Sequence, residues 1–238
     1  MLQLLEERKT RRGGGVLWER LALEAHRLRV VTLVGAGGKT TLLYALAREA
    51  AALGLTVCVT TTTHMMRHLG LPKGRVYQVG QDLPEGKIGL LLPIAECAAE
   101  ADLVLVEGDG AHELPLKAPG EQEPVIPPES GAVICVAGLS ALGEPIERVC
   151  HRTAQVCALL GKSPQESVTA ADVATILASD RGGRKGVPPG AFYRCALNQA
   201  ETPLRRQGAA EIIAALEKQH ILAAETAFTE GERDGCWF

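Results

Sequence analysis

The chain has 238 residues, of which 46% are hydrophobic and 22% are charged, and its formal net charge is −3. A chain of this length buries enough apolar surface to fold without disulfides or a structural metal. The charge balance excludes a broadly basic surface for nucleic acid. The aromatic content of 3% argues against a platform that stacks single-stranded bases. We therefore expect a globular protein that has no nucleic-acid partner.

The sequence carries no apolar run close to the roughly 20 residues that span a bilayer. Near the start, Glu6 and Glu7 interrupt the pattern of a secretory leader. The 7 cysteines include no Cys-x-x-Cys pair, so neither a disulfide framework nor a zinc site is indicated. These features predict a reduced, cytoplasmic protein with no membrane partner.

The organisation of the chain changes near residue 30. Residues 1–29 carry charge clusters and a glycine triplet, and we expect an N-terminal arm or helix there. From residue 30 onward, strand and helix patterns alternate, which predicts a single α/β domain over residues 30–238. We expect the three-layer fold of the P-loop NTPases, with a mostly parallel sheet covered by helices. The irregular segments 108–130 and 180–190 are long enough to be functional loops.

The individual elements follow from hydrophobic periodicity. Short β-branched or continuously apolar runs predict buried strands, which we expect at residues 30–34, 55–60, 103–106, 132–137 and 192–197. Apolar residues at helical spacing predict helices, which we expect over 42–53, over 94–101, after Thr169 and after Thr202.

A glycine-rich loop between the first strand and the first helix gives the sharpest functional signal. It consists of Gly35, Ala36, Gly37, Gly38, Lys39, Thr40 and Thr41. Such a loop curls backbone N–H groups around phosphate, while the lysine reaches the β- and γ-phosphates and the first threonine binds Mg²⁺. Leu33 stands where the longer P-loop pattern has glycine, so the loop resembles the shorter one of the Mur ligases. The alternative is a glycine-rich turn with a surface lysine.

A second candidate element is a pair of acids that follows an uninterrupted apolar strand. Glu107 and Asp109 come directly after Leu103–Val106. Carboxylates at the end of a buried strand hold Mg²⁺ in P-loop enzymes. Because Asp-Gly is also a common turn pair, a capping role is the alternative. The sequence leaves open which of the two acids lies closer to the ion.

A run of threonines follows the second expected strand and ends at His64. Thr60 and Thr61 fit plain strand propensity as well as they fit a ligand role. Thr63 and His64 lie past the strand, so we expect them to contact substrate. A histidine there can also move a proton near neutral pH.

The chain resembles the YqeC family in the segments VVTLVGAGGKTTLLYALA, VTTTTHM, LVLVEGDGAHELPLKAP, EPVIP and AGLSALGEPI. The resemblance runs from about residue 30 to 152 and continues more loosely to about 216. It implies a cytosolic P-loop nucleotide-binding accessory protein in the maturation of a selenium-dependent molybdenum hydroxylase. A molybdoenzyme or a selenium-delivery protein is the implied macromolecular partner.

The same resemblance directs attention to the long loop after the acids. It suggests that Lys117 and Glu123 bind a substrate. Further along the chain, His151 and Arg152 form a candidate anion-sensing pair. Gln122 stands where the family pattern has histidine, which removes any role for a histidine at that position. Gly108 replaces an alanine between the two acids and leaves both acids usable. The basic residues Arg184 and Lys185 are expected to be solvated.

One further element concerns the base of a nucleotide. Asn198 and Glu201 follow an expected strand and resemble a weakened form of the Asn-Lys-x-Asp element that reads guanine in GTPases. The competing interpretation is a turn before the helix that opens at Thr202, and the turn is slightly favoured.

The expected function is nucleotide hydrolysis with Mg²⁺ and ATP or GTP as cofactors. A phosphoryl or nucleotidyl transferase or ligase acting on a small acceptor is the second hypothesis, and a non-catalytic switch is the third. The candidate catalytic residues are Lys39, His64 and Asp109. The candidate nucleotide-binding residues are the loop residues 35–41 with Asn198 and Glu201. The candidate metal ligands are Thr40, Glu107 and Asp109, and the candidate substrate-binding residues are Thr63, His64, Lys117, Glu123, His151 and Arg152.

Overall fold

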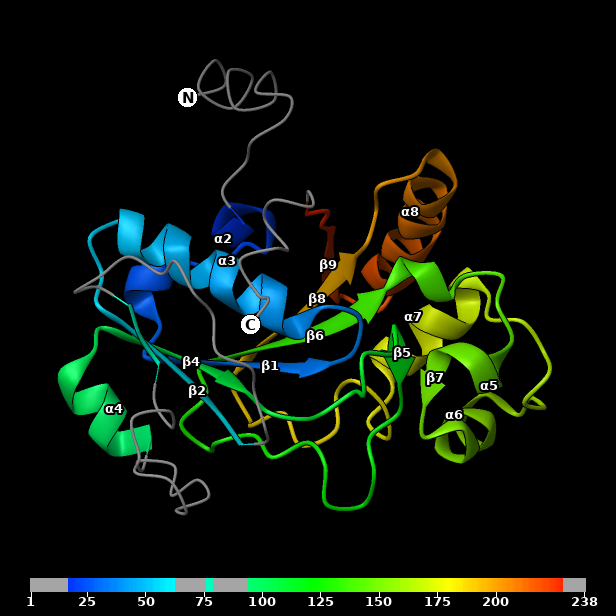
Figure 1. Ribbon diagram of the computed structural model, residues 1–238, viewed down its shortest axis with the longest axis horizontal. Coiled ribbons are helices and arrows are strands. Elements are labelled where there is room, and N and C mark those ends of the chain that lie inside the picture. The colour runs from blue at the N-terminus through cyan, green and yellow to red at the C-terminus, as the bar shows by residue number, and fades with distance from the viewer. Residues whose placement is uncertain (1–16, 63–75, 79–93, 229–238) are drawn as a thin grey trace.

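The computed structural model of the chain describes residues 17–62, 76–78 and 94–228 (Figure 1). Its centre is a seven-stranded sheet in the order β3-β2-β4-β1-β6-β8-β9, in which all neighbouring strands run parallel. The strands are β1 (Val30–Gly35), β2 (Val57–Thr61), β3 (Val76–Gln78), β4 (Leu103–Glu107), β6 (Ala132–Gly138), β8 (Phe192–Asn198) and β9 (Leu222–Glu225). A separate parallel pair joins β5 (Leu116–Lys117) to β7 (Cys150–His151).

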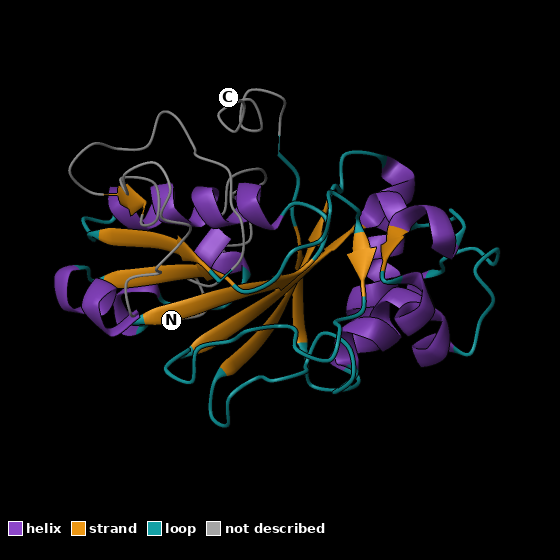
Figure 2. Ribbon diagram, turned by 60° about the horizontal axis from the view of Figure 1, so that its bottom comes forward, coloured by secondary structure: helices purple, strands orange, loops and turns teal. Residues whose placement is uncertain are grey.

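Helices cover both faces of the twisted sheet (Figure 2). They are α2 (Leu17–Arg20), α3 (Lys39–Ala52), α4 (Ile94–Glu100), α5 (Ile146–Val149), α6 (Thr153–Leu160), α7 (Ala170–Ala178) and α8 (Pro203–Glu217), with 3₁₀ turns η1 (Ala25–Arg27) and η2 (Leu139–Ala141). Alternation along β1 divides the core, because successive strand side chains point to opposite faces. Val31 and Leu33 pack with α2 and α3. On the other face Val34 packs with α7 and α8, and Val30 packs with α4.

The expected α/β class and parallel sheet are confirmed, and each expected strand and helix is present. The helix after the glycine-rich loop begins at Lys39, three residues earlier than its apolar spacing indicates. The sequence analysis did not predict β3, which has only three residues, or β9, whose Leu-Ala-Ala-Glu sequence has little strand propensity. It also did not predict the two-residue strands β5 and β7 or the one-turn helix α5.

The segment before β1 belongs to the core. Trp18 of α2 is buried, and its indole N–H donates to Leu46 O of α3 at 3.1 Å. The Glu49 carboxylate accepts the backbone N–H of Leu17 at 2.9 Å, which satisfies a free donor at the start of α2. Two contacts therefore fix α2 against α3.

The parallel arrangement brings the carboxyl ends of the strands to one edge of the sheet, where open α/β sheets bind ligands. β1 ends at Gly35, β2 at Thr61, β4 at Glu107, β6 at Gly138 and β8 at Asn198. Thr61 is in register with Glu107 and Gly138 with Asn198. Residues distant in sequence are thereby adjacent at this edge.

The close approach of the glycine-rich loop to the end of β6 requires glycine at position 37. Gly37 has a φ of 83°, and a Cβ atom there would lie 2.3 Å from Gly138 N and 2.8 Å from Pro115 O. Both of these atoms belong to the backbone and cannot swing aside. Any larger residue at position 37 must therefore displace the loop or its neighbours.

Gly37→Ala tests this constraint, with Gly143→Ala as its control. Gly143 has the same φ of 83° but no atom within 4 Å of its would-be Cβ. Both substitutions incur the left-handed backbone cost of about 1–2 kcal/mol, and the clash at Gly37 adds about 1–3 kcal/mol. Urea unfolding of the two variants measures how much more stability Gly37→Ala loses than Gly143→Ala. Equal losses in the free energy of unfolding would contradict the close approach of the loop to β6.

Candidate functional site

The glycine-rich loop between β1 and α3 is held in shape by its neighbours. The N–H of Gly35 donates to Asp109 Oδ2 at 3.2 Å. The N–H of Ala36 donates to Val136 O at 2.8 Å, and that of Gly37 to Leu114 O at 3.1 Å. The first half of the loop is therefore tied to three different segments, so its conformation is set before any ligand arrives.

The second half of the loop opens onto the start of α3. Gly38, in the left-handed conformation, is the N-cap of the helix and offers no side-chain cap. The first backbone bond of the helix runs from Leu42 N to Gly38 O at 3.1 Å. Within the described residues, the N–H groups of Lys39, Thr40 and Thr41 consequently donate to no backbone carbonyl. These donors and the helix dipole make the start of α3 attractive to an anion.

Lys39 lies buried at this helix start, with a side-chain exposure of 4%. Its Nζ donates to Gly35 O at 2.7 Å. The same atom is 3.3 Å from Asp109 Oδ1 and 3.9 Å from Glu107 Oε1. The ammonium group therefore sits between the glycine-rich loop and the two acids that follow β4.

Glu107 joins the helix start to the end of β4. Thr40 Oγ1 donates to Glu107 Oε2 at 2.9 Å. Burial raises the pKa of Glu107, and the Lys39 charge and the Thr40 hydrogen bond oppose that rise. Its backbone carbonyl accepts the hydroxyls of Thr61 and Thr62, both at 3.2 Å. The threonine run after β2 thus helps to fix the position of this acid.

Lys117 of β5 engages all three of its ammonium donors inside the protein. Its Nζ lies 2.6 Å from Gly110 O, 2.8 Å from Asp109 Oδ2 and 3.0 Å from Glu123 Oε2. A lysine has three donors, and the side chain is only 1% exposed. In this arrangement Lys117 has no donor left for a substrate and instead supports Asp109.

Glu123 extends the series of charges to the surface. Arg152 binds it with two nitrogens, Nη2 at 2.8 Å and Nε at 3.1 Å. Burial alone would raise the pKa of Glu123, but Arg152 and Lys117 outweigh it and lower the pKa to about 2. We call the alternating series Lys39, Asp109, Lys117, Glu123 and Arg152 the charge chain.

His151 lies beside the charge chain, because β7 places it in register with Lys117 of β5. Its Nδ1 atom is buried and has no hydrogen-bond partner in the described part of the chain. Burial lowers the pKa of His151, and the charge of Lys117 lowers it further. The ring centroid of His112 is 4.7 Å away. Sequence reasoning missed His112, which only the fold brings to His151.

The structure places Asn198 beneath the glycine-rich loop. Its Nδ2 donates to Gly37 O at 2.9 Å, and its Oδ1 accepts from Gln199 N at 2.8 Å and Thr226 Oγ1 at 3.2 Å. The buried amide is thereby occupied within the protein. Glu201 lies instead in the turn before α8 and pairs with Arg205 Nη1 at 3.1 Å.

The remaining candidate residues divide into three groups. Thr63 and His64 lie outside the described residues. Thr60 is buried in β2, and its hydroxyl has no partner among the described residues. Arg184 pairs with Asp180 at 3.3 Å, and Lys185 Nζ donates to Glu121 O at 2.9 Å.

The backbone carbonyls of residues 114 and 115 accept hydrogen bonds that hold the glycine-rich loop and β6. The sequence gives no signal for these two carbonyls, since any residue type supplies one.

The fold and this sheet edge define a parallel α/β protein in which a glycine-rich loop meets two carboxylates. The chain belongs to the YqeC family. The family model described as YqeC protein matches residues 31–154. The chain is also 35% identical over 188 residues to "Uncharacterized protein YqeC" of Escherichia coli (strain K12), an alignment that covers 69% of this chain and 73% of that protein. The family resemblance expected from the sequence is thus confirmed.

Among the described residues, no helix has both the length and the apolar character required to cross a membrane.

Lys117→Met tests whether the buried ammonium supports the site. Removing one partner of a buried ion pair costs about 3–5 kcal/mol, and here Asp109 and Glu123 each lose one of their two cations. We expect the free energy of unfolding in urea to fall by that amount. Lys218→Met, at an exposed lysine after α8, should change it by less than about 0.5 kcal/mol. Equal stability of the two variants would show that Lys117 is not held as described.

Glu123→Gln tests the electrostatic part of the charge chain through pH. Because the pKa of Glu123 is lowered from 4.5 to about 2, the charged form stabilises the folded state fully above pH 4.5, and this stabilisation is lost as the pH falls toward 2. Urea midpoints should therefore differ most between wild type and variant at pH 7, and the difference should shrink below pH 4.5.

The control for this titration is Glu129→Gln. Glu129 is exposed, and within the described ranges it forms no ion pair. The urea midpoint of Glu129→Gln should equal that of the wild-type protein at every pH. If the difference in urea midpoint between wild type and Glu123→Gln stayed constant from pH 7 to pH 3, the charge of Glu123 would not contribute to stability.

Proposed function

We propose that this protein binds a nucleoside triphosphate together with Mg²⁺ at the start of α3 and hydrolyses it. In this proposal the loop at residues 35–41 is a shortened P-loop. The cellular role implied by the family resemblance is the maturation of a selenium-dependent molybdenum hydroxylase. Asn198 supports the loop from below in this scheme, and Thr63 and His64 remain candidates for contact with the transferred phosphate.

The observation that carries the proposal is the burial of Lys39 at an uncapped helix N-terminus, facing two carboxylates. A lysine that served only as a surface turn residue would be exposed, whereas Lys39 is buried between the loop and the two acids. The three adjacent N–H groups and the lysine together form a cation and donor set suited to the β- and γ-phosphates. An incoming phosphate would replace Gly35 O and Asp109 Oδ1 as the partners of Lys39.

The residues beside Lys39 fit Mg²⁺, which prefers oxygen ligands and is held in nucleotide sites by one or two carboxylates and the phosphates. Asp109 Oδ1 is a buried oxygen that lies 3.3 Å from Lys39 Nζ and accepts no hydrogen bond from the described residues. Thr40 Oγ1 and Glu107 Oε2 are 2.9 Å apart. The described residues contain no group of three or more His, Cys, Asp or Glu side chains that could hold a metal. Thr40, Glu107 and Asp109 would therefore hold the ion jointly with nucleotide phosphates, where it would neutralise charge during phosphoryl transfer.

Lys39→Ala tests nucleotide binding by calorimetric titration with ATP and GTP in the presence of Mg²⁺. A hydrogen bond to a charged group contributes about 1.5–3 kcal/mol, so the affinity should fall by about 10- to 100-fold. Lys218→Ala is the control, and circular dichroism verifies that both variants are folded. Unchanged affinity of a folded Lys39→Ala protein would refute the P-loop assignment.

Thr40→Val separates the metal from the nucleotide, since valine keeps the shape and loses the hydroxyl. We expect the gain in nucleotide affinity on adding Mg²⁺ to fall at least tenfold, while affinity measured in EDTA changes little. Thr175→Val, at an exposed helical threonine, should behave as wild type. Steady-state phosphate release in the same proteins distinguishes hydrolysis from binding alone.

A further inference from the structure

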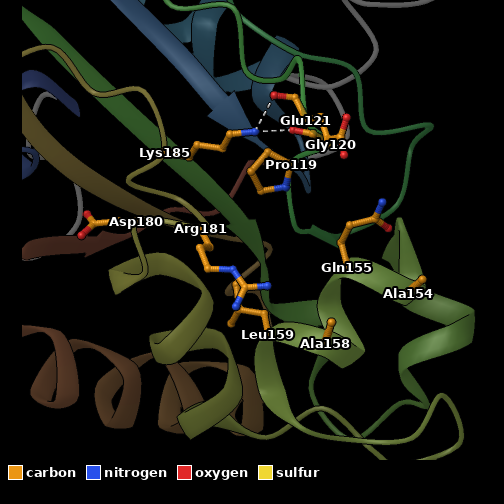
Figure 3. Close-up of a pocket in the computed structure, with 10 residues that line it drawn as sticks. All are labelled: Pro119, Gly120, Glu121, Ala154, Gln155, Ala158, Leu159, Asp180, Arg181 and Lys185. Carbon is orange, nitrogen blue, oxygen red and sulfur yellow. Dashed lines mark hydrogen bonds between the residues drawn. The ribbon is translucent and has the colours of Figure 1, made fainter.

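A cavity of about 400 Å³ lies beside α6, separate from the glycine-rich loop. Its walls are residues 119–121, the outer face of α6 and the loop at residues 180–185 (Figure 3). The volume falls in the range of small-molecule sites, which combine apolar walls with a few placed polar groups. Pro119, Ala158 and Leu159 supply apolar surface here, and Gln155 and Arg181 supply polar groups. We call this space the α6 cavity.

The loop at residues 180–185, which forms one wall of the open α6 cavity, is held in place by several contacts. Two glycines let it approach the core, since a Cβ at Gly182 would lie 2.1 Å from Ile176 O and one at Gly183 2.5 Å from the Tyr193 hydroxyl. Lys185 Nζ fastens the loop to the opposite wall by donating to Gly120 O and Glu121 O (Figure 3). A fixed loop means that the walls of the cavity need little reorganisation on binding.

This loop lines the cavity with Asp180, Arg181 and Lys185, of which Arg181 carries the guanidinium. Figure 3 shows its guanidinium extending toward Leu159 and Ala158 of α6. Within the described part of the chain, that guanidinium forms no ion pair, whereas the neighbouring Arg184 pairs with Asp180 at 3.3 Å. A guanidinium is a planar donor fork matched to carboxylate and phosphate. The cavity therefore combines one available oxyanion receptor with an apolar wall.

The α6 cavity adjoins the charge chain. Pro119 lines it and also a second, smaller hollow beside Asp109 and Lys117. Gly120 forms part of the same wall, and a Cβ at Gly120 would lie 2.9 Å from Arg152 Cζ. The guanidinium of Arg152 thus rests against the backbone that lines the cavity. A molecule bound there would be separated from the charge chain by a single layer of backbone.

We propose that the α6 cavity binds a second small molecule, one that carries a carboxylate or phosphate bound by Arg181 and an apolar body packed against Leu159 and Ala158. Binding in the cavity is independent of the phosphate loop. Only the role of that molecule as a second ligand of the same reaction rests on the proposed function.

Benzoate and phenyl phosphate are probes of this chemistry, and benzamide is their neutral counterpart. Two-dimensional amide NMR of the full chain gives a residue-resolved titration. Both anions should shift the amides of residues 154–159 and 181–185 saturably, and benzamide at equal concentration should not. A preference for one of the two anions identifies the oxyanion as carboxylate or phosphate.

Arg181→Gln should weaken the affinity of the anions for the cavity at least tenfold, and the matched variant Arg184→Gln should change it less than twofold. Ala158→Trp, which fills the cavity from the exposed face of α6, should abolish the shifts. Equal losses in the two arginine variants, or no saturable shift at the cavity with either anion, would overturn the proposal. Shifts at residues 35–41 report on the phosphate loop separately, so the failure of one proposal leaves the other measurable.

Discussion

The candidate site depends on one buried carboxylate, that of Asp109. An ionised carboxylate is stable away from water only where cations and donors compensate it. Lys39 approaches one of its oxygens and Lys117 the other. Because Lys117 is itself buried, it needs Glu123 as a further partner, and Glu123 needs Arg152, whose side chain is 34% exposed. The charge chain thus links the buried carboxylate at the sheet edge, through alternating partners, to side chains that reach solvent.

This arrangement gives the two lysines different tasks. Lys39 borders an uncapped helix start, so an anion arriving there competes with Asp109 for its ammonium group. Lys117 has no such competitor, because its three donors are enclosed. In the proposed scheme, an anion that takes Lys39 leaves Asp109 paired with Lys117 and in position, with one carboxylate oxygen released. The site can exchange partners at one end without losing its shape at the other.

Local sequence signals were enough to predict the alternation of strands and helices, the glycine-rich loop and the acids after β4. Each rests on periodicity or on residue order within a short window. The links from Asp109 to Lys117 and from Glu123 to Arg152 could not be predicted as pairs. They depend on β5 and β7, two-residue strands with no pattern of their own, and on side-chain directions set by distant packing. Likewise, Asn198 reads as a turn or base-recognition residue, and only the register of β6 with β8 brings it under Gly37.

The contact between α2 and α3 has an optical consequence. The chain has 2 tryptophans, and the indole of Trp18 is hydrogen-bonded to Leu46 O, seven residues along α3 from Lys39. Seven residues of α-helix span about 10 Å. The indole is therefore anchored to the same rigid helix that begins at the glycine-rich loop. In a Trp237→Phe variant, which leaves Trp18 as the one tryptophan of the sequence, its emission reports how α3 shifts against α2 without an attached dye.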